Sequence, residues 1–454
     1  MKINKFFKIY QIIFFVLVSY IIFKSELIFK GQNREYYFFY LIVSIFFFFF
    51  SFITLFLNEE KNKNFFLVFV SIIFISYIIE ISIFSLNQYI GYKKLNYKIK
   101  SYKDKTGLTF DIRSKFEVYN EKKKLGRYFP KVHPSDFYID KKLNILPLSN
   151  ISFSNSINCN ENGYFFISKN DKFGFNNPKG TWDEINYNFI LIGDSFVRGE
   201  CVNRPFDISS VLRQSDFNLK VLNLGQAGSG PLSQFAILRE YSKKNSTEKL
   251  LWFFYEENDF QDLENEKKSK ILINYIKDEN FSQNLTSHQD LLDEIIINKI
   301  NNIIYQKNSK IINNQYESFV RIVKLYNLRF LLINFFKKKN YYEYSHNLEL
   351  FNEILKKVKK ISETKKSELV FIYLPGYNRF NIKNEKYKNY IKKMNKDVID
   401  LVNELNIRVI DFSEDFENMP NPNIFFPFEL DGHYNEKGYK FISHKILQYL
   451  DYKS

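Results

Sequence analysis

Three long apolar segments lie within the first hundred residues, and they limit what this part of the chain can fold into. Ile9–Phe23 and Tyr36–Leu57 contain no charged residue, and Phe65–Tyr92 contains only Glu80. A helix needs about 20 apolar residues to cross the hydrocarbon core of a bilayer. The second segment meets this length directly. The third segment meets this length if Glu80 lies near the membrane–water interface. The first segment meets it if the flexible side chain of Lys8 reaches that interface.

These segments predict a membrane region over residues 1–92 with three transmembrane helices. A secretory signal peptide would have one short apolar core and a small-residue cleavage site, which the sequence lacks. The alternative is one signal anchor followed by a buried Phe-rich hairpin. Lys2, Lys5 and Lys8 favour a cytoplasmic N-terminus, although Lys93 and Lys94 oppose that orientation. We therefore expect a multi-pass protein of the cell (inner) membrane with its larger part outside the cytoplasm.

The charge of the chain fits a membrane protein better than a nucleic-acid-binding one. The 454 residues include 65 Lys+Arg and 50 Asp+Glu, a net charge of +15, and 12 basic and 5 acidic residues fall within the first 100. The basic excess is thus concentrated beside the apolar segments. The sequence shows no basic recognition helix, RNA-binding aromatic motif or metal finger, so no nucleic-acid partner is predicted. It also shows no set of ligands at metal-binding spacing, so neither a metal nor another cofactor is predicted.

The last part of the chain, residues 181–454, has the pattern of an α/β domain. It contains five short runs of nearly continuous apolar residues. Such short runs suit strands that are buried on both faces of a parallel sheet. An apolar stripe from Ile391 to Leu405 predicts a helix between the last two runs. Strands alternating with helices predict a doubly wound parallel sheet. The five runs are Asn188–Ile192, Leu219–Leu224, Lys249–Tyr255, Glu368–Leu374 and Ile407–Phe412.

Two further segments complete the predicted organisation. We expect residues 93–180 to form a polar, Asn-rich leader of short strands and loops that packs on the α/β domain. About a hundred residues, roughly 260–367, separate the third and fourth strands and contain helical patches at Leu291–Ile304 and Phe319–Phe336. A loop of this length must fold on itself. This helical insertion either covers one edge of the site or is a surface elaboration with no role in binding.

Reactive residues follow the first predicted strand. Ligands bind beyond the carboxyl ends of the strands in an open parallel sheet. The first strand ends in Gly193-Asp194-Ser195. A serine at the tip of a strand exposes its hydroxyl and its N–H to the same space, which suits a nucleophile whose attack creates an oxyanion. Alternatively, Asp194 or Ser195 only caps the following helix.

The second and third strands lead to residues that can stabilise an oxyanion. Gly228 lies in a glycine-rich loop after the second strand, where its N–H can face a ligand. Asn258 follows the third strand, and side-chain amides stabilise oxyanions in other hydrolases. A plain turn and a polar loop or helix cap are the respective alternatives.

A histidine and nearby acids follow the fifth strand. In Asp431-Gly432-His433 the carboxylate lies two residues from the imidazole, so Asp431 can hold the tautomer of His433 and stabilise its imidazolium. Glu429 and Glu436 are the alternative acids for this role.

Taken together, these segments resemble the SGNH, or GDSL, hydrolases from about Tyr187 to Leu450. The first block is Gly193-Asp194-Ser195-Phe-Val-Arg-Gly199. The resemblance implies a flavodoxin-like three-layer domain. It also implies a catalytic triad and an oxyanion hole formed by the N–H of the nucleophile, a glycine and an asparagine. The matching positions are Ser195, His433 and Asp431 for the triad, and Ser195, Gly228 and Asn258 for the oxyanion hole.

Two departures from the family pattern widen the expected chemistry. Glu256 stands where the third block usually begins with glycine, and the last block is Asp-x-His instead of Asp-x-x-His. The tighter spacing is similar to membrane-associated SGNH-like proteins that acetylate bacterial surface polysaccharides. The prediction is a membrane-anchored esterase or O-acyltransferase whose substrate is an acylated carbohydrate or lipid, most simply an acetyl ester of cell-surface carbohydrate. A catalytically silent glycan-binding protein, in a complex with polysaccharide assembly or export proteins, is the alternative.

The only two cysteines, Cys159 and Cys201, lie in the leader and close after the serine turn. The leader also resembles the segment that precedes such domains in bacterial proteins tied to surface glycans. If the domain lies outside the cytoplasm, the two thiols can form a disulfide that tethers the leader to the catalytic loop. Two buried free thiols are the alternative.

Overall fold

The computed structural model describes residues 3–31, 34–53, 56–138, 140, 143–311, 314–336 and 344–452. The chain forms two compact units. The first contains residues 1–94 and 310–339, and the second contains residues 95–309 and 340–454. The first unit therefore includes the predicted membrane region together with part of the predicted insertion.

The first unit is built from apolar helices that pack through aromatic rings. They are α1 (Ile3–Ile22), which continues as a π-helix over Phe23–Ile28, α2 (Arg34–Ile53) and the first part of α3 (Glu59–Thr106). Ring centroids lie 5.6 Å apart for Phe14 and Phe47, and 5.0 Å apart for Tyr10 and Phe69. Two stretches, Lys8–Ile28 and Glu59–Thr106, are long and apolar enough to cross a membrane, whereas the apolar part of α2, Tyr40–Ile53, is shorter.

The predicted insertion is divided between the two units. Helices α11 (Asn314–Val323) and α12 (Tyr326–Phe336) belong to the first unit. Helix α10 (Gln289–Ile311) packs into the core of the second through Leu292 and Ile296. Helix α13 (Ser345–Thr364) is the crossover between the third and fourth strands of the sheet. Part of this segment is thus an ordinary layer of the α/β fold.

The second unit contains a five-stranded parallel sheet in the order β5-β4-β6-β7-β8. This is the doubly wound, flavodoxin-like order that the sequence predicted. Side chains of each strand alternate between two cores, as for Leu250 and Trp252 on one face and Leu251 and Phe253 on the other. The strands are β4 (Asn186–Ile192), β5 (Val221–Asn223), β6 (Ser246–Tyr255), β7 (Glu368–Leu374) and β8 (Arg408–Asp411).

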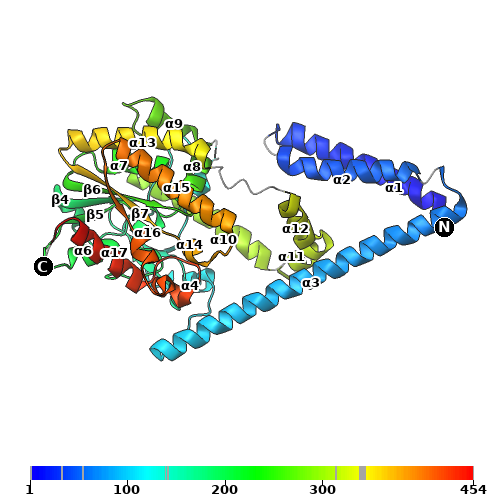
Figure 1. Ribbon diagram of the computed structural model, residues 1–454, viewed down its shortest axis with the longest axis horizontal. Helices are drawn as coiled ribbons and strands as arrows, with labels where there is room; N and C mark the ends of the chain where they lie inside the picture. The colour runs from blue at the N-terminus through cyan, green and yellow to red at the C-terminus, as the bar shows by residue number, and fades with distance from the viewer. Residues whose placement is uncertain are drawn as a thin grey trace. The chain divides into compact units, whose positions relative to one another are not determined.

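Helices cover both faces of the sheet and make a three-layer domain (Figure 1). One face carries α7 (Pro231–Tyr241), α13 and α15 (Glu385–Glu404), and the other carries α6 (Ile208–Arg213) and α17 (Glu436–Tyr449). The predicted apolar stripe of α15 is buried. Because all five strands are parallel, their carboxyl ends share one edge. The shorter helices are α5 (Ser195–Arg198), α8 (Asp259–Glu266), α9 (Lys270–Lys277), α14 (Tyr377–Asn381) and α16 (Ser413–Glu417).

The leader forms a small sheet that packs against the first strand-end turn. Its elements are α4 (Lys115–Lys122), β1 (Tyr128–Pro130), β2 (Asn155–Ile157) and β3 (Ile167–Lys169), in the order β1-β2-β3. The fully buried Arg198, from the serine turn, donates at 2.9 Å to Ser168 Oγ and to Asn170 Oδ1 in the leader. It also donates to Gln226 Oε1 at 3.1 Å, so one guanidinium joins the leader to the turns after β4 and β5.

A buried cluster of charges strengthens the same junction. Lys131 from the leader forms an ion pair with Glu200, whose carboxylate also lies 3.1 Å from Arg198 Nε. All three side chains are almost fully buried. Burial by itself would raise the pKa of Glu200, but the charges of Lys131 and Arg198 outweigh burial and lower this pKa to about 2. The carboxylate is therefore ionised and is the counter-charge of both Arg198 and Lys131, although burial lowers the pKa of Lys131 to about 7.

Replacing Glu200 by alanine should strongly destabilise the protein, because two buried cations would lose their counter-charge. We expect a loss of about 3–5 kcal/mol in the free energy of unfolding, measured by denaturant unfolding of the purified protein in detergent. The control is Glu184→Ala, which removes an exposed pair with Lys220 and should cost about 1 kcal/mol or less. Equal losses for the two variants would show that the cluster does not hold the leader.

Candidate active site

The turn after β4 presents Ser195 at the carboxyl edge of the sheet. Asp194 caps α5, because its Oδ1 accepts the N–H of Phe196 at 2.9 Å. Asp194 therefore caps the helix that follows the turn, which was one of the two interpretations of this turn from the sequence. The hydroxyl of Ser195 is left free of that role and faces the loop before α17.

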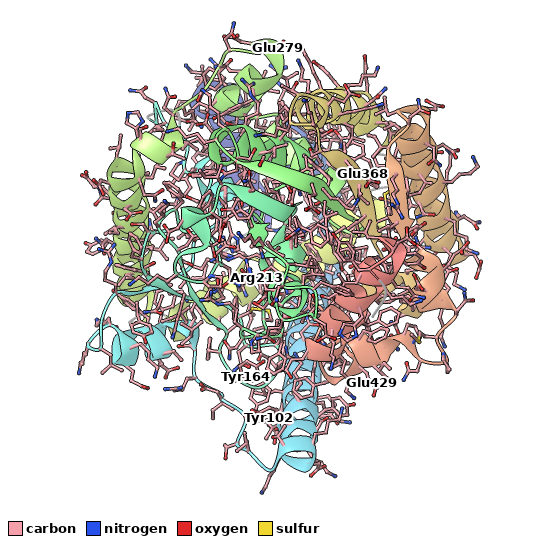
Figure 2. All side chains as sticks on the ribbon, turned by 90° about the vertical axis from the view of Figure 1, so that its left-hand side faces the viewer. Tyr102, Tyr164, Arg213, Glu279, Glu368 and Glu429 are labelled. Atoms are coloured by element: carbon pink, nitrogen blue, oxygen red, sulfur yellow. A yellow bond between two sulfur atoms is a disulfide. The ribbon has the colours of Figure 1, made fainter. Side chains whose placement is uncertain are left out.

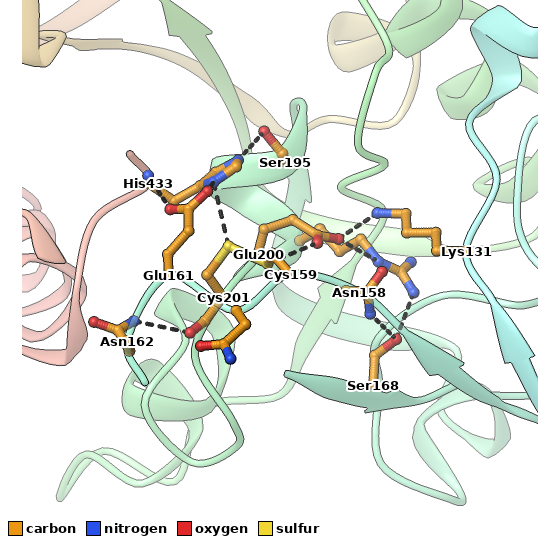
Figure 3. Close-up of a disulfide and its surroundings, with 12 residues drawn as sticks. Lys131, Asn158, Cys159, Glu161, Asn162, Ser168, Ser195, Glu200, Cys201 and His433 are labelled. Carbon is orange, nitrogen blue, oxygen red and sulfur yellow. Dashed lines mark hydrogen bonds and ion pairs between the residues drawn. A yellow bond between two sulfur atoms is a disulfide. The ribbon is translucent and has the colours of Figure 1, made fainter. Parts of the chain in front are cut away.

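His433 lies within hydrogen-bond distance of Ser195 and of a carboxylate on its other side (Figure 3). Its Nε2 is 2.9 Å from Ser195 Oγ. Its Nδ1 is 3.1 Å from Glu161 Oε1, and its backbone N–H donates to Glu161 Oε2 at 2.7 Å. A carboxylate at Nδ1 favours the tautomer with the proton on Nδ1, which leaves Nε2 free to accept the serine proton. The geometry is that of a Ser195–His433–Glu161 triad.

The carboxylate that contacts His433 in the structure is Glu161, whereas the sequence predicted Asp431 for this position. Asp431 is exposed, and no hydrogen bond joins it to His433 in the described part of the chain. The alternative acids have other partners: Glu429 accepts from Asn421 Nδ2 at 3.3 Å, and Glu436 accepts from the Tyr164 hydroxyl at 3.0 Å.

Glycine at position 432 explains why the leader supplies the acid. A Cβ at Gly432 would lie 2.6 Å from Glu161 Oε2, so this residue leaves the room that the Glu161 carboxylate occupies beside His433. Glu161 and His433 are separated by 272 positions in the chain. No spacing pattern could have revealed this pair, and the only nearby signal is Cys159, two residues before Glu161.

A disulfide between Cys159 and Cys201 holds the acidic loop against the serine turn. The side chain of Asn162 adds a hydrogen bond to the carbonyl of Cys201 at 2.9 Å. Donor atoms of Glu161, Cys201 and His433 lie within 4.8 Å of one another, a spacing that would suit a metal ion. Cys201 is oxidised in the disulfide, however, and metal binding to cysteine requires the thiolate. These three residues therefore suit a catalytic triad and its tether, and they do not suit a metal centre.

The charges around His433 favour its protonated form. Burial disfavours the imidazolium, but the carboxylates of Glu161, Glu200 and Asp194 outweigh burial and raise the pKa of His433 above its ordinary value of 6.5. Burial also acts to raise the pKa of Glu161, but the adjacent His433 outweighs it and holds this pKa below its ordinary value. Glu161 is thus a stable anion whose charge favours the imidazolium form of His433.

The predicted oxyanion donors lie in loops at the same strand ends. Asn258 is the N-cap residue directly before α8, but its side chain makes no capping hydrogen bond, and its Nδ2 donates to Asp194 Oδ2 at 3.2 Å. The same Asp194 oxygen is 3.3 Å from Ser195 Oγ, so the Asn258 amide is adjacent to the nucleophile.

Gly228 lies against His133 of the leader. Its φ of 72° favours glycine, and a Cβ there would lie 3.1 Å from the ring of His133. His133 Nδ1 in turn lies 3.2 Å from the carbonyl oxygen of Ala227. In the part of the chain that the structure describes, the N–H groups of Ser195 and Gly228 have no hydrogen-bond acceptor. A substrate oxyanion is the group that these donors would bind.

Glu256, the departure from the family pattern, has a structural role. Its buried carboxylate is 2.6 Å from Arg379 Nη2, and it accepts the N–H of Gly376 at 2.7 Å and the hydroxyl of Tyr373 at 2.9 Å. Glu256 therefore orders the turn after β7. This departure does not remove any of the groups gathered around Ser195.

Among known proteins, only solved structures were found to be similar to this chain. No protein-family model and no curated protein sequence matches the chain. A lipolytic protein of the G-D-S-L family from Desulfitobacterium hafniense matches with 14% identity and a TM-score of 0.30, over 58% of this chain and 99% of its own. The acetyl xylan esterase AlAXEase matches with 10% identity and a TM-score of 0.32, over 59% of this chain and 100% of its own.

Axe2, an acetylxylan esterase from Geobacillus stearothermophilus, matches with 12% identity and a TM-score of 0.31, over 59% of this chain and 95% of its own. The G-D-S-L family is the one that the sequence motifs resemble. At TM-scores near 0.3 these likenesses carry no conclusion of their own. The fold and the site are therefore assigned from the strand order and the contacts described above.

Replacing Glu161 should impair Ser195 far more than replacing Asp431. The readout is the rate at which a fluorophosphonate probe labels Ser195 in the purified, detergent-solubilised protein. Glu161→Gln should lower this rate by on the order of a hundredfold or more, because the tautomer of His433 is no longer held. Asp431→Asn should leave the rate close to wild type. The reverse ranking would restore Asp431 as the third triad member.

The pH dependence of labelling provides a second readout of the same pair. His433 must be neutral to accept the serine proton, so the labelling rate should rise with pH through a midpoint above 6.5. Without the Glu161 charge, burial is the dominant remaining influence, and the midpoint should move to lower pH in Glu161→Gln. An unchanged midpoint would show that Glu161 does not interact with the catalytic histidine.

Proposed function

We propose that the protein is a membrane-anchored SGNH-type serine esterase or O-acyltransferase that acts on acetyl esters of cell-surface carbohydrate. The observation that supports this most directly is the hydrogen-bonded chain from Ser195 through His433 to Glu161. Its neighbours, the N–H groups of Ser195 and Gly228 and the amide of Asn258, are the donors that acyl transfer requires.

The reaction follows from this arrangement. Ser195 Oγ attacks the carbonyl carbon of the ester while its proton passes to His433 Nε2. The negative charge that develops on the carbonyl oxygen is stabilised by the N–H groups of Ser195 and Gly228 and by the Asn258 amide. His433 then gives the proton to the departing sugar oxygen, which leaves an acetyl group on Ser195.

The second half of the reaction decides between hydrolysis and transfer. His433 removes a proton from the incoming hydroxyl, which attacks the acetyl-serine, and Ser195 is regenerated when it takes the proton back. If the incoming group is water, the protein is an esterase. If it is a sugar hydroxyl, the protein moves the acetyl group from one carbohydrate or lipid to another.

A hollow of about 360 Å³ beside the catalytic loops supports a carbohydrate substrate. The rings of Tyr102, Tyr164 and Phe428 line it together with polar side chains such as Asn162 and Glu429. Figure 2 labels Tyr102, Tyr164 and Glu429. Flat aromatic faces beside a few amide and carboxylate groups are suited to sugar rings, which have apolar faces and hydroxyl edges. Asn162 directly follows the triad residue Glu161 in the chain.

The backbone near this hollow is held in an uncommon conformation. Phe428 and Glu429 have φ values of 56° and 59°, which non-glycine residues rarely adopt. Such conformations are concentrated at binding and catalytic sites, because the surrounding structure must hold them in place. They support a binding role for the loop that also bears His433.

Anchoring in the cell membrane, with the catalytic unit outside the cytoplasm, is part of the proposal. The apolar stretches Lys8–Ile28 and Glu59–Thr106 support membrane anchoring. The Cys159–Cys201 disulfide supports an extracytoplasmic site, because disulfides persist in oxidising compartments.

Ser195→Ala should abolish hydrolysis of a small acetyl ester by the purified protein. Cells that carry this variant should also show a surface glycan whose mass differs by acetyl groups from that of wild-type cells. A gain of acetyl in the variant would indicate an esterase, and a loss would indicate a transferase. A wild-type protein that turns over no ester, with glycan binding unchanged in Ser195→Ala, would favour the silent glycan-binding alternative.

Tyr164→Ala should weaken binding of an acetylated oligosaccharide without affecting a small acetyl ester. We expect the KM for the oligosaccharide to rise about tenfold, equivalent to ~1.4 kcal/mol, because a ring that lines the hollow is lost. Tyr164→Phe is the matched control, since it keeps the ring and removes only the hydroxyl that binds Glu436. Equal KM values for all three proteins would exclude the hollow as a sugar site.

A further inference from the structure

Glu80, the only charged residue of the Phe65–Tyr92 segment, is fully buried in the first unit. Its carboxylate binds the start of α12. Glu80 Oε1 accepts the backbone N–H of Asn327 at 3.1 Å and the Asn327 side-chain amide at 2.8 Å. Glu80 Oε2 accepts the N–H of Leu328 at 2.7 Å. Both oxygens are therefore used by one helix end.

This pairing resolves two problems that an apolar surrounding creates. The first N–H groups of a helix have no partner within the helix, and the positive end of the helix dipole favours an anion. In hydrocarbon there is no water to satisfy either these N–H groups or a lone carboxylate. The pairing of Glu80 with α12 satisfies both without water.

Other contacts join α11 and α12 to α2 and α3. Tyr77 lies three residues before Glu80 on α3, and its hydroxyl donates at 3.0 Å to the carbonyl of Val323, the last residue of α11. The guanidinium of Arg329 on α12 lies 5.2 Å from the ring centre of Tyr40 on α2. The end of α11 and the start of α12 are thus bound by polar groups that lie within the apolar segments of α2 and α3.

The remaining surface of α12 is apolar and open. Phe330, Leu331 and Leu332 are 60%, 51% and 41% exposed. Arg329, which stacks on Tyr40, is the only charged residue in the helix. Helix α3 of the same unit also exposes apolar side chains, and its Phe74 is 66% exposed. An exposed surface of this kind is expected to be covered in the cell.

We propose that α12 is inserted in the lipid bilayer and that its exposed side chains contact acyl chains. With 11 residues the helix is roughly 16 Å long, about half of the ~30 Å hydrocarbon core. It therefore enters the membrane without crossing it, and the chain returns to the side from which it came. The inference rests on the membrane anchoring proposed above. In this proposal α12 attaches the protein to the membrane at a second place. This place lies between β6 and β7, far along the chain from α1–α3.

The test uses single-cysteine variants carrying an environment-sensitive fluorophore, in proteoliposomes. The two native cysteines are joined in a disulfide, so an introduced thiol is labelled selectively. Phe330→Cys reports on α12 and Phe74→Cys on the membrane part of α3. Lys388→Cys of α15, whose side chain is half-exposed, reports on a position in water. Two quenchers are compared, namely lipids with spin-labelled acyl chains and aqueous iodide.

We expect the spin-labelled lipids to quench the probes at positions 330 and 74, and iodide to quench the probe at 388. A probe at 330 that iodide quenches as it does the probe at 388 would overturn the inference while leaving the anchoring intact. Quenching at 330 by neither agent would also overturn it, since a protein surface would then cover α12. Iodide quenching at both 330 and 74 would instead disprove the anchoring on which the inference rests.

The role of Glu80 is tested in the same Phe330→Cys background. Glu80→Leu should abolish lipid quenching at position 330, because the start of α12 loses its acceptors. Glu80→Gln keeps one acceptor oxygen and should retain part of the quenching. The separate Phe74→Cys probe with Glu80→Leu shows whether α3 itself is still inserted. Unchanged lipid quenching at 330 in Glu80→Leu, with α3 inserted, would show that this carboxylate does not hold α12.

Discussion

The contact between the Glu161 carboxylate and His433 is the interaction on which the catalytic unit depends. It orients the imidazole toward Ser195, yet Glu161 belongs to the leader and not to the α/β domain. Activity therefore requires the leader to be docked correctly. The Cys159–Cys201 disulfide and the ion cluster around Glu200 both act on that junction. The leader is thus part of the proposed active site, and the proposed mechanism couples catalytic competence to the stability of this junction.

Buried carboxylates join distant segments throughout this chain, and each is matched by a particular set of donors. Glu200 is neutralised by two cations, and Glu256 by Arg379 with two neutral donors. Glu80 instead accepts the free N–H groups at the start of α12. In each case the surrounding donors offset part of the cost of removing the carboxylate from water. The same chemistry therefore serves the catalytic domain and the apolar first unit.

Much of the architecture could be predicted from local patterns. The five apolar runs became the five parallel strands, because continuous apolar runs bounded by turns report burial on both faces. Ser195 and His433 were predicted and are brought together, since each lies within a few residues of a strand end or loop that the parallel topology gathers at one edge. The insertion was harder to interpret. The spacing of its apolar residues predicted helices, but this spacing does not determine which of the two units a helix packs against.

Local sequence patterns were enough to predict the doubly wound sheet, the apolar helices and the positions of Ser195 and His433, because these depend on short-range periodicity and on residues beside strand ends. Only the tertiary structure decided which carboxylate serves His433 and what satisfies Glu80. Asp431 is two residues from His433, whereas Glu161 is 272 positions away and reaches it through the space that Gly432 leaves open. The partner of a polar group is set by packing in three dimensions, and proximity along the chain does not determine it.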